Sequence, residues 1–368
     1  MLQALAQAEQ SAGLASPNPA VGCVLVKDGV VVGAGFHAYE EKDHAEVVAL
    51  RQAGDAARGA TAYVTLEPCC ITGRTGPCTR ALIAAGVARV VAATLDPNPA
   101  VHGKGAEELR KAGIAVDAGV LEAEARRVND GFARHIQSGL PFVTLKAAVS
   151  LDGRIAPPPG SVPRGAPLYL TGEAARAEVQ RMRHRVDAVV TGINTVLEDD
   201  PLLTDRTGLP RRRKLLRVVL DSGLRIRLDA KLVRTAEDDV LVFCTVAATE
   251  HQRTLEAMGV RVERVEPDTT GKTGARGVCL GQVFRRLGEM GMTTVLLEGG
   301  GQLNASALRG GHVDRLSLFY APMFLGPGAV PLLREAVAGL RWEAVPAVKK
   351  FGQDVLVEAT LRNPWEES

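Results

Sequence analysis

Aromatic residues are scarce in this sequence, and neither sign of charge dominates it. Phe, Trp and Tyr make up 4% of the 368 residues, and 44 Lys and Arg residues face 42 Asp and Glu residues, a formal net charge of +2. Nucleic-acid-binding proteins typically present a basic surface with stacking aromatic side chains. The composition therefore excludes no fold, but it argues against nucleic acid as a partner. One basic run, residues 211–214, is predicted to be a solvated loop.

Long apolar runs are also absent from the chain. No stretch reaches the roughly 18 consecutive apolar residues that a membrane-spanning helix requires. Residues 1–13 lack the basic segment of a secretion signal and are too polar for one, so they predict an amphipathic helix. We therefore expect a cytoplasmic protein with no membrane partner.

Cysteines are few and unevenly spread. Three of the six, Cys69, Cys70 and Cys78, lie within ten residues, while Cys23, Cys244 and Cys279 are scattered. In a long chain without a secretion signal, such a cluster indicates a metal site or catalysis before it indicates disulfides.

Apolar periodicity in the first part of the chain predicts a layered α/β domain. Runs at 21–26 and 30–36, joined by Lys27-Asp28-Gly29, are typical of a β-hairpin. Helices are then expected at 44–53, 79–85, 107–112 and 122–138, and strands at 62–66, 87–93 and 114–116. Gly139 and Pro141 end the last helix, so we place the domain boundary there and expect domains at 1–140 and 141–368.

The second part of the chain shows a similar alternation. Strands are expected at 142–149, 187–191, 215–220, 240–245 and 294–297, and a helix at 173–185. A Pro/Gly-rich loop covers 157–167. The polar tail, 363–368, is expected to fray. This half also belongs to the α/β class.

One His, one Glu and two Cys are spaced as in a catalytic zinc site. His44 opens a predicted helix with Glu46 two residues on, Cys69 follows a predicted strand, and Cys78 precedes the next helix. Three protein ligands leave a fourth tetrahedral position for water, whose pKa zinc can lower to about 7. Glu46 can stay off the metal and carry protons.

The spacing matches the zinc-deaminase signature H-x-E with P-C-x-x-C, apart from a longer insert between the two cysteines. Cys70 could compete with Cys69 as a ligand. Adjacent cysteines rarely share one tetrahedral metal, so we favour Cys69.

The sequence resembles the bifunctional riboflavin-biosynthesis deaminase–reductase family almost end to end. In the first half the resemblance rests on motifs at 17–19, 21–23, 44–47, 65–69, 73–75, 77–78 and 96–99. In the second half it rests on Lys146 and on motifs at 150–153, 195–196, 199–201, 203–204, 221–222 and 298–300. The first half alone would resemble any cytidine-deaminase-like domain, so the second half makes the match specific.

The resemblance implies a cytidine-deaminase-like three-layer α/β domain followed by a dihydrofolate-reductase-like α/β domain. The first would use zinc to deaminate a phosphoribosylaminopyrimidine, and the second would use NADPH to reduce its ribosyl group to ribityl. It implies zinc ligation by His44, Cys69 and Cys78 and proton transfer by Glu46. Substrate contacts would come from Asn18, Arg74 and Thr75. Relatives of both domains often associate, so we expect a homo-oligomer.

In the reductase half the resemblance implies a further set of contacts. NADPH would be bound by Ala148, Tyr169, Thr195, Asp199, Ser222, Gly300 and Gly301. Substrate would be bound by Arg183, Leu203, Arg206 and Glu298. The glycines at 299–301 stand between a predicted strand and a predicted helix, where backbone N–H groups can meet phosphate. No complete G-x-G-x-x-G fingerprint appears, so a standard Rossmann site is not indicated.

Three departures from the family's usual pattern involve four residues. Cys70-Ile71 stands where Ser and His are usual, Ala20 where many relatives carry a polar residue, and Tyr169 where Trp is common. Ile71 removes a polar contact that the family would place near the deaminase site.

Two other functions remain possible at this point. A nucleoside or tRNA deaminase with an unrelated C-terminal module would need a basic, aromatic-rich surface. A zinc-stabilised binding protein would need a fourth protein ligand and no Glu46.

Overall fold

A computed structural model of the chain describes residues 1–163, 168–246, 249–268, 277–343 and 345–366. The chain divides into two units, each with its own core. Unit 1 comprises residues 1–139, 210–213 and 364–368, and unit 2 comprises 140–209 and 214–363. No helix in the described ranges combines the length and apolarity needed to cross a membrane.

Unit 1 is built on a five-stranded sheet in the order β2-β1-β3-β4-β5. Its strands are β1 (Gly22–Lys27), β2 (Val30–Phe36), β3 (Thr61–Val64), β4 (Arg89–Ala92) and β5 (Ala115–Ala118). Its helices are α1 (Leu2–Gln10), α2 (Ala45–Ala53), α3 (Cys78–Ala85), α4 (Lys104–Lys111), α5 (Glu122–Val128) and α6 (Asp130–Ser138). β1 is antiparallel to β2, as the predicted hairpin requires, and Asp28 and Gly29 form its turn with positive φ angles.

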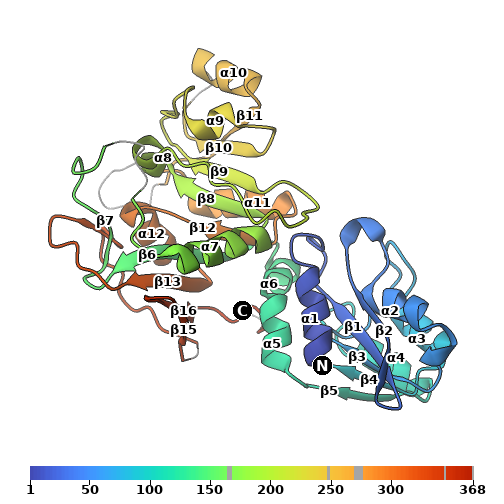
Figure 1. Ribbon diagram of the computed structural model, residues 1–368. Helices are drawn as coiled ribbons and strands as arrows, with labels where there is room; N and C mark the ends of the chain where they lie inside the picture. The colour runs from blue at the N-terminus through green and yellow to red at the C-terminus, as the bar shows by residue number, and fades with distance from the viewer. Residues whose placement is uncertain (164–167, 247–248, 269–276, 344, 367–368) are drawn as a thin grey trace. The chain divides into compact units, whose positions relative to one another are not determined.

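Close helix packing on both faces of this sheet makes unit 1 a three-layer structure (Figure 1). A Cβ atom on Gly22 would lie 2.1 Å from the carbonyl oxygen of Ala4 in α1, and one on Gly35 would lie 2.7 Å from that of Ala45 in α2. Gly35 pairs with Cys23, the residue next to Gly22 in β1. Because neighbouring residues of a strand point to opposite faces, α1 and α2 cover opposite faces.

Two sequence predictions for unit 1 are wrong. The helix expected over 122–138 is two helices, broken at Asn129, whose side-chain amide exchanges hydrogen bonds with the backbone N–H and carbonyl of Ala20. The described part of the tail, which ends at residue 366, is packed and not frayed. The indole N–H of Trp365 donates to Asp130 at 2.9 Å, and Arg126 stacks on the Trp365 ring. In both cases a partner distant in sequence overrides the local pattern.

Unit 2 contains a nine-stranded sheet in the order β11-β10-β9-β8-β12-β6-β13-β16-β15. Its strands are β6 (Phe142–Ser150), β8 (Ala188–Gly192), β9 (Leu216–Leu220), β10 (Val240–Cys244), β11 (Val260–Arg264), β12 (Thr294–Leu297), β13 (Arg315–Ala321), β15 (Ala347–Phe351) and β16 (Asp354–Thr360). Neighbours from β11 to β13 are parallel, and β16 and β15 are antiparallel. A separate pair joins β7 (Arg154–Ala156) and β14 (Val330–Pro331).

Helices cover both faces of this sheet. They are α7 (Glu173–Arg185), α8 (Ile193–Asp199), α9 (Lys231–Arg234), α10 (Glu250–Ala257), α11 (Leu280–Glu289) and α12 (Gly301–Arg309). Ala175 and Val179 of α7 pack on Phe319 and Leu356, whereas α11 and α12 contribute to a larger core with β6, β8 and β12. The parallel strands are buried, as expected for a sheet covered on both sides.

Candidate functional site

Three donor atoms of the predicted zinc ligands meet in unit 1. His44 caps the N-terminus of α2, Cys78 is the first residue of α3, and Cys69 lies in the loop after β3. His44 Nδ1 is 3.2 Å from Cys78 Sγ and 3.5 Å from Cys69 Sγ, and all three donor atoms lie within 4.8 Å of one another. Ligands at bond lengths of about 2.0–2.3 Å around a tetrahedral zinc stand roughly 3.3–3.8 Å apart. The cluster therefore fits zinc in both donor chemistry and size.

The surroundings of Cys69 favour the thiolate that a metal ligand must provide. Its sulfur accepts the backbone N–H of Cys78 at 3.4 Å, at the start of α3. Hydrogen bonds from the Cys78 thiol and from His44 hold the pKa of Cys69 well below its ordinary value, although burial opposes them. Cys70 is half-exposed and is not among the three clustered residues. The structure thus brings Cys69, and not its neighbour, into the cluster.

Glu46 is buried beside this cluster, with 3% of its surface exposed. It lies in the first turn of α2, two residues after His44. Burial, together with the charge of Cys69, raises the pKa of the Glu46 carboxyl to about 7. A carboxyl group that titrates near neutral pH is suited to taking up and releasing a proton.

His37 also lies beside the cluster, although no motif predicts a role for it. Its Nδ1–H donates to the carbonyl of Asp43 at 2.9 Å, and its Nε2 accepts a hydrogen bond from the Asn18 side chain at 3.0 Å. Burial lowers the pKa of His37, which favours the neutral ring that this pairing needs. Its ring also contacts that of His44, with centroids 5.1 Å apart. His37 therefore orients the predicted substrate residue Asn18 next to a predicted ligand.

The loop between the cysteines carries the other predicted substrate contacts. Arg74 is exposed and donates to the carbonyl of Tyr39 at 3.0 Å, and the backbone carbonyl of Thr75 accepts the N–H of Gly73. Ile71 is 41% exposed, so the departure at this position leaves no buried gap.

Buried Glu67 fixes the strand end that precedes Cys69. Its carboxylate accepts backbone N–H groups of Asp96, Gly103 and Ala106 at 2.9–3.1 Å. Three such bonds tie the loops after β3 and β4 together, and so they hold the segment from which Cys69 projects.

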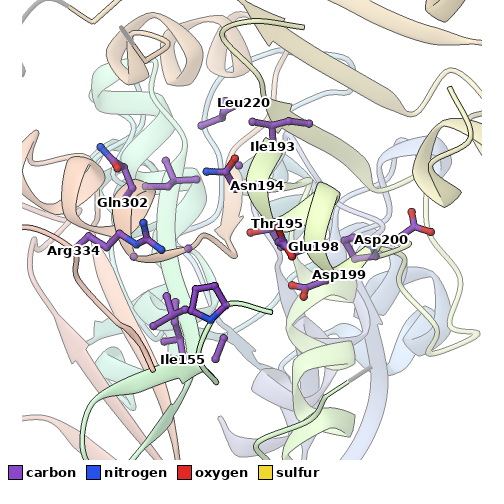
Figure 2. A pocket seen from close by; sticks show the side chains of 18 of the residues that line it. Ile155, Ile193, Asn194, Thr195, Glu198, Asp199, Asp200, Leu220, Gln302 and Arg334 are labelled. Atoms are coloured by element: carbon purple, nitrogen blue, oxygen red, sulfur yellow. The ribbon is translucent and has the colours of Figure 1, made fainter. Parts of the chain in front are cut away.

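Unit 2 holds a cavity of about 1030 Å³ at the carboxyl ends of its parallel strands. Thr195, Glu198 and Asp199 reach it from α8, and Gln302 and Arg334 reach it from α12 and the segment after β14 (Figure 2). Open α/β sheets bind ligands at this edge, and the volume suits a large organic cofactor. The residues present therefore fit a dinucleotide and a small substrate.

Most of the predicted reductase residues line this cavity. The lining includes Tyr169, Arg183, Thr195, Asp199, Leu203, Arg206, Ser222, Gly300 and Gly301. Ala148, in β6, and Glu298 are not among the lining residues. Gly300 caps α12, and a Cβ on Gly301 would lie 2.5 Å from the carbonyl oxygen of Pro331, so a larger residue is excluded there.

Glu298 instead anchors Arg183 behind the cavity wall. Two hydrogen bonds, of 2.7 and 3.1 Å, join the Arg183 guanidinium to both carboxylate oxygens, and Lys146 Nζ lies 3.5 Å from one of them. Burial opposes ionisation, but the charges of Arg183 and Lys146 hold the pKa of Glu298 at about 2. Lys146, which contributed to the family resemblance but had no predicted role, thus belongs to the charge network of Arg183 and Glu298.

Tyr169 and the segment 199–206 form another side of the cavity. Arg176 stacks on the Tyr169 ring at 4.6 Å, and the tyrosine is 57% exposed. Leu203 is buried with φ of 54°, an uncommon backbone state for leucine that fixes the turn. Arg206 is exposed, with its backbone N–H bonded to Gln180. The proline-rich loop lines the cavity at 157–160, and its residues 164–167 lie outside the described residues.

Comparison with known proteins finds relatives over nearly the whole chain. "Riboflavin biosynthesis protein RibD" of Aquifex aeolicus is 42% identical over 328 residues, covering 89% of this chain and 87% of the relative. The protein of the same name from Actinobacillus pleuropneumoniae is 39% identical and covers 99% of this chain. The solved structure of Acinetobacter baumannii RibD matches with a TM-score of 0.82, 37% identity and coverage of 98% of this chain and 97% of that one.

A second solved structure, from Thermotoga maritima, is described as a diaminohydroxyphosphoribosylaminopyrimidine deaminase/5-amino-6-(5-phosphoribosylamino)uracil reductase. It is 33% identical with a TM-score of 0.82, and it covers 98% of this chain and 97% of that one. The predicted fold classes of both halves are therefore confirmed.

Family models match the two halves separately. Residues 1–94 match the cytidine and deoxycytidylate deaminase zinc-binding region, and residues 141–357 match the RibD C-terminal domain. The second match excludes a deaminase with an unrelated C-terminal module. The chain belongs to the RibD family of riboflavin-biosynthesis proteins.

Proposed function

We propose that this bifunctional deaminase–reductase of riboflavin biosynthesis acts in two steps. The first is hydrolytic deamination of 2,5-diamino-6-(5-phosphoribosylamino)pyrimidin-4-one, and the second is NADPH-dependent reduction of the ribosyl group to ribityl. We assign the first to residues 1–140 and the second to residues 141–368. The observation that carries this proposal is the His44, Cys69 and Cys78 cluster beside buried Glu46, in a chain that also holds the unit 2 cavity.

In the deaminase site each residue has a distinct task. His44, Cys69 and Cys78 would hold zinc, a Lewis acid that would activate water at neutral pH. Glu46 accepts a proton from the attacking water and delivers it to the amino group, which leaves as ammonia. Asn18, held by His37, orients the pyrimidine.

Arg74 and Thr75 are assigned to the phosphoribosyl end of the same substrate. Arg74 supplies a guanidinium group, which can bind a phosphate through two parallel hydrogen bonds. Its exposed position leaves it accessible to a ligand from solvent.

In the reductase site the chain positions a hydride donor against the sugar. NADPH would supply the hydride, and the backbone N–H groups of Gly300 and Gly301 at the start of α12 would be available to its phosphates. Ala148, Tyr169, Thr195, Asp199 and Ser222 complete its binding site. Arg206 and Leu203 contact the substrate, and Glu298 keeps Arg183 fixed for the same purpose.

We further propose that the protein works in the cytoplasm as a homo-oligomer. Six free cysteines agree with a reducing compartment. Trp342 and Val348, near or within β15, are 52% and 64% exposed, and an apolar edge of this kind suits contact with a second copy. Light scattering on the purified protein would give a mass of a dimer or larger; the mass of one chain would contradict the proposal.

Mass spectrometry of products tests the two activities. Zinc-loaded protein is incubated with the diaminopyrimidine substrate, with and without NADPH. We expect a deaminated product without NADPH and a deaminated ribityl product with it. Deamination without reduction would overturn the reductase assignments, beginning with Tyr169. Absence of both products would overturn the proposed identity of the substrate.

A further inference from the structure

A short segment of the reductase half packs in unit 1. Residues 210–213 lie within the range matched by the RibD C-terminal domain, 141–357. They nevertheless belong to unit 1, while the chain on both sides of them belongs to unit 2. This segment contains most of the basic run that was predicted to be a solvated loop, and that prediction is wrong for Arg212, whose side chain is only 21% exposed.

Arg212 is bound to two separate loops of unit 1. Its backbone N–H donates to Gly13, and its guanidinium donates to the carbonyl of Ser16, both at 2.8 Å. The same guanidinium donates to Glu40 at 2.7 Å. Arg213 adds a bond of 3.0 Å to the Ser16 hydroxyl.

The ring of Tyr39 links Arg212 to the predicted substrate residue Arg74. The guanidinium carbons of Arg212 and Arg74 lie 3.7 and 4.0 Å from the ring centroid. Two guanidinium groups cannot share one face of a phenol ring at these distances, so they stack on opposite faces. The Tyr39 backbone carbonyl also accepts a hydrogen bond from Arg74 at 3.0 Å.

The loops joined by Arg212 are those that lead into the zinc site. Residues 13–16 precede Asn18, whose backbone N–H donates to Ala15, and the N–H of Tyr39 donates to Leu14. The turn at Tyr39–Glu41 precedes His44. Arg212 therefore contacts both the segment that leads to Asn18 and the turn that precedes His44, although it is far from the metal ligands in sequence.

We propose that Arg212 is a positioning residue of the deaminase site. By stacking on Tyr39 it fixes the ring that holds Arg74, and so it sets the guanidinium where it meets the substrate phosphate. Glu40 offsets the positive charge on the far side of the ring. This inference rests on the proposed role of Arg74 as a phosphoribosyl contact. An unsupported arginine on an exposed loop would lose side-chain entropy on binding, and the stack removes that cost beforehand.

Deaminase kinetics of the full-length, zinc-loaded protein test the inference. The variants are Arg74→Ala, Arg212→Ala, the double variant, and the pair Tyr39→Leu and Tyr39→Phe. Lys214→Ala is the matched control, because it removes the next cation of the same run from an exposed site outside unit 1. Zinc content and reductase activity are measured on every sample.

We expect Arg212→Ala and Tyr39→Leu to raise the deaminase KM by about tenfold, with kcat within about twofold of wild type. Tyr39→Phe keeps the ring and Lys214→Ala keeps the stack, so both should behave as wild type. The double variant should be no worse than Arg74→Ala.

Other outcomes would distinguish a failure of the Arg212 inference from a failure of the proposed role of Arg74. An unchanged KM in Arg74→Ala would overturn the proposed role of Arg74 in substrate binding, and with it the proposed positioning of Arg74 by Tyr39 and Arg212. A raised KM in Arg74→Ala with an unchanged KM in Arg212→Ala would overturn the inference alone. Additive effects would mean that Arg212 binds substrate directly, and a fall in kcat with loss of zinc would mean that it only supports the fold.

Discussion

Two nearly buried glutamates, one in each half of the chain, have opposite electrostatic surroundings. Glu46 is 3% exposed, and the Glu298 side chain is 12% exposed. Burial and the charge of Cys69 raise the pKa of Glu46 to about 7. Arg183 and Lys146 hold the pKa of Glu298 at about 2 against the effect of burial. Burial alone does not decide what a carboxyl group can do, because its charged neighbours determine the sign of the shift.

The difference separates a proton carrier from a fixed anion. Glu46 exchanges its proton near neutral pH, and a bound zinc ion would favour its carboxylate form, which is the form that accepts a proton. Glu298 stays ionised throughout the physiological range, so its function is to hold Arg183. The predictions below test this contrast.

The largest effect is expected from Glu46→Gln. Removing a positioned general acid–base should lower the deaminase kcat by about 10²–10⁴-fold. Zinc content and NADPH-dependent reduction should persist, because Gln keeps the volume of the buried side chain. Retained deamination, measured as ammonia release, would show that another group carries the proton.

The next largest effect concerns the partner of Glu298. Arg183→Ala leaves the buried Glu298 carboxylate with Lys146, at 3.5 Å, as its remaining partner and should lower the free energy of unfolding by about 3–5 kcal/mol. Arg181→Ala is the control on the same helix, since the Arg181 side chain is 49% exposed and its pair with Glu178 should contribute less than about 1 kcal/mol. Denaturant unfolding measures both, and equal effects would contradict the fixed-anion role.

The pH dependence of the free energy of unfolding tests the ionisation of Glu298. Its folded pKa lies below the unfolded value, so its stabilisation is complete above pH about 4.5 and is lost as pH falls toward 2. At pH 3 the wild type should lose about 2 kcal/mol from this group. Glu298→Gln lacks this titration, so its unfolding free energy should fall less between pH 5 and pH 3. Parallel curves for the two proteins would argue against the depressed pKa.

The smallest effect is expected from replacing Asp199, a third carboxyl group to compare with Glu46 and Glu298. Burial and Glu198 raise the pKa of Asp199, which lines the unit 2 cavity with no cation bonded to it in the described part of the chain. Asp199→Ala should lower kcat/KM for NADPH by about tenfold, the value of one polar contact, and leave deamination unchanged. Loss of both activities in one sample would point to misfolding instead.

Local sequence predicted the zinc cluster because its geometry is local. His44 and Cys78 are fixed by the starts of two helices that the sequence predicts, and Cys69 lies in the loop after β3, in a motif that the sequence also shows. His37 escaped prediction because an isolated histidine has no distinguishing motif, and its partners Asn18 and Asp43 identify it only in three dimensions.

Elements that depend on distant partners were the ones missed or misjudged. The break at Asn129 is made by Ala20, and the ordered tail by Asp130, and neither partner is near in sequence. Strands β13 and β16 were not predicted, although β13 pairs with β6 and β16 pairs with β13 in the unit 2 sheet. Family resemblance, and not periodicity, predicted the contact residues that line the unit 2 cavity, because they come from segments spread between Ile155 and Glu335.

The path of the chain between its two units constrains how such a gene can be divided. The chain passes from one unit to the other after residues 139, 209, 213 and 363. A split gene that ends near codon 140 would encode a deaminase without Arg212 and without Trp365, whose indole N–H donates to Asp130 at the start of α6. A deaminase unit cut at this point would therefore need other residues to replace both contacts.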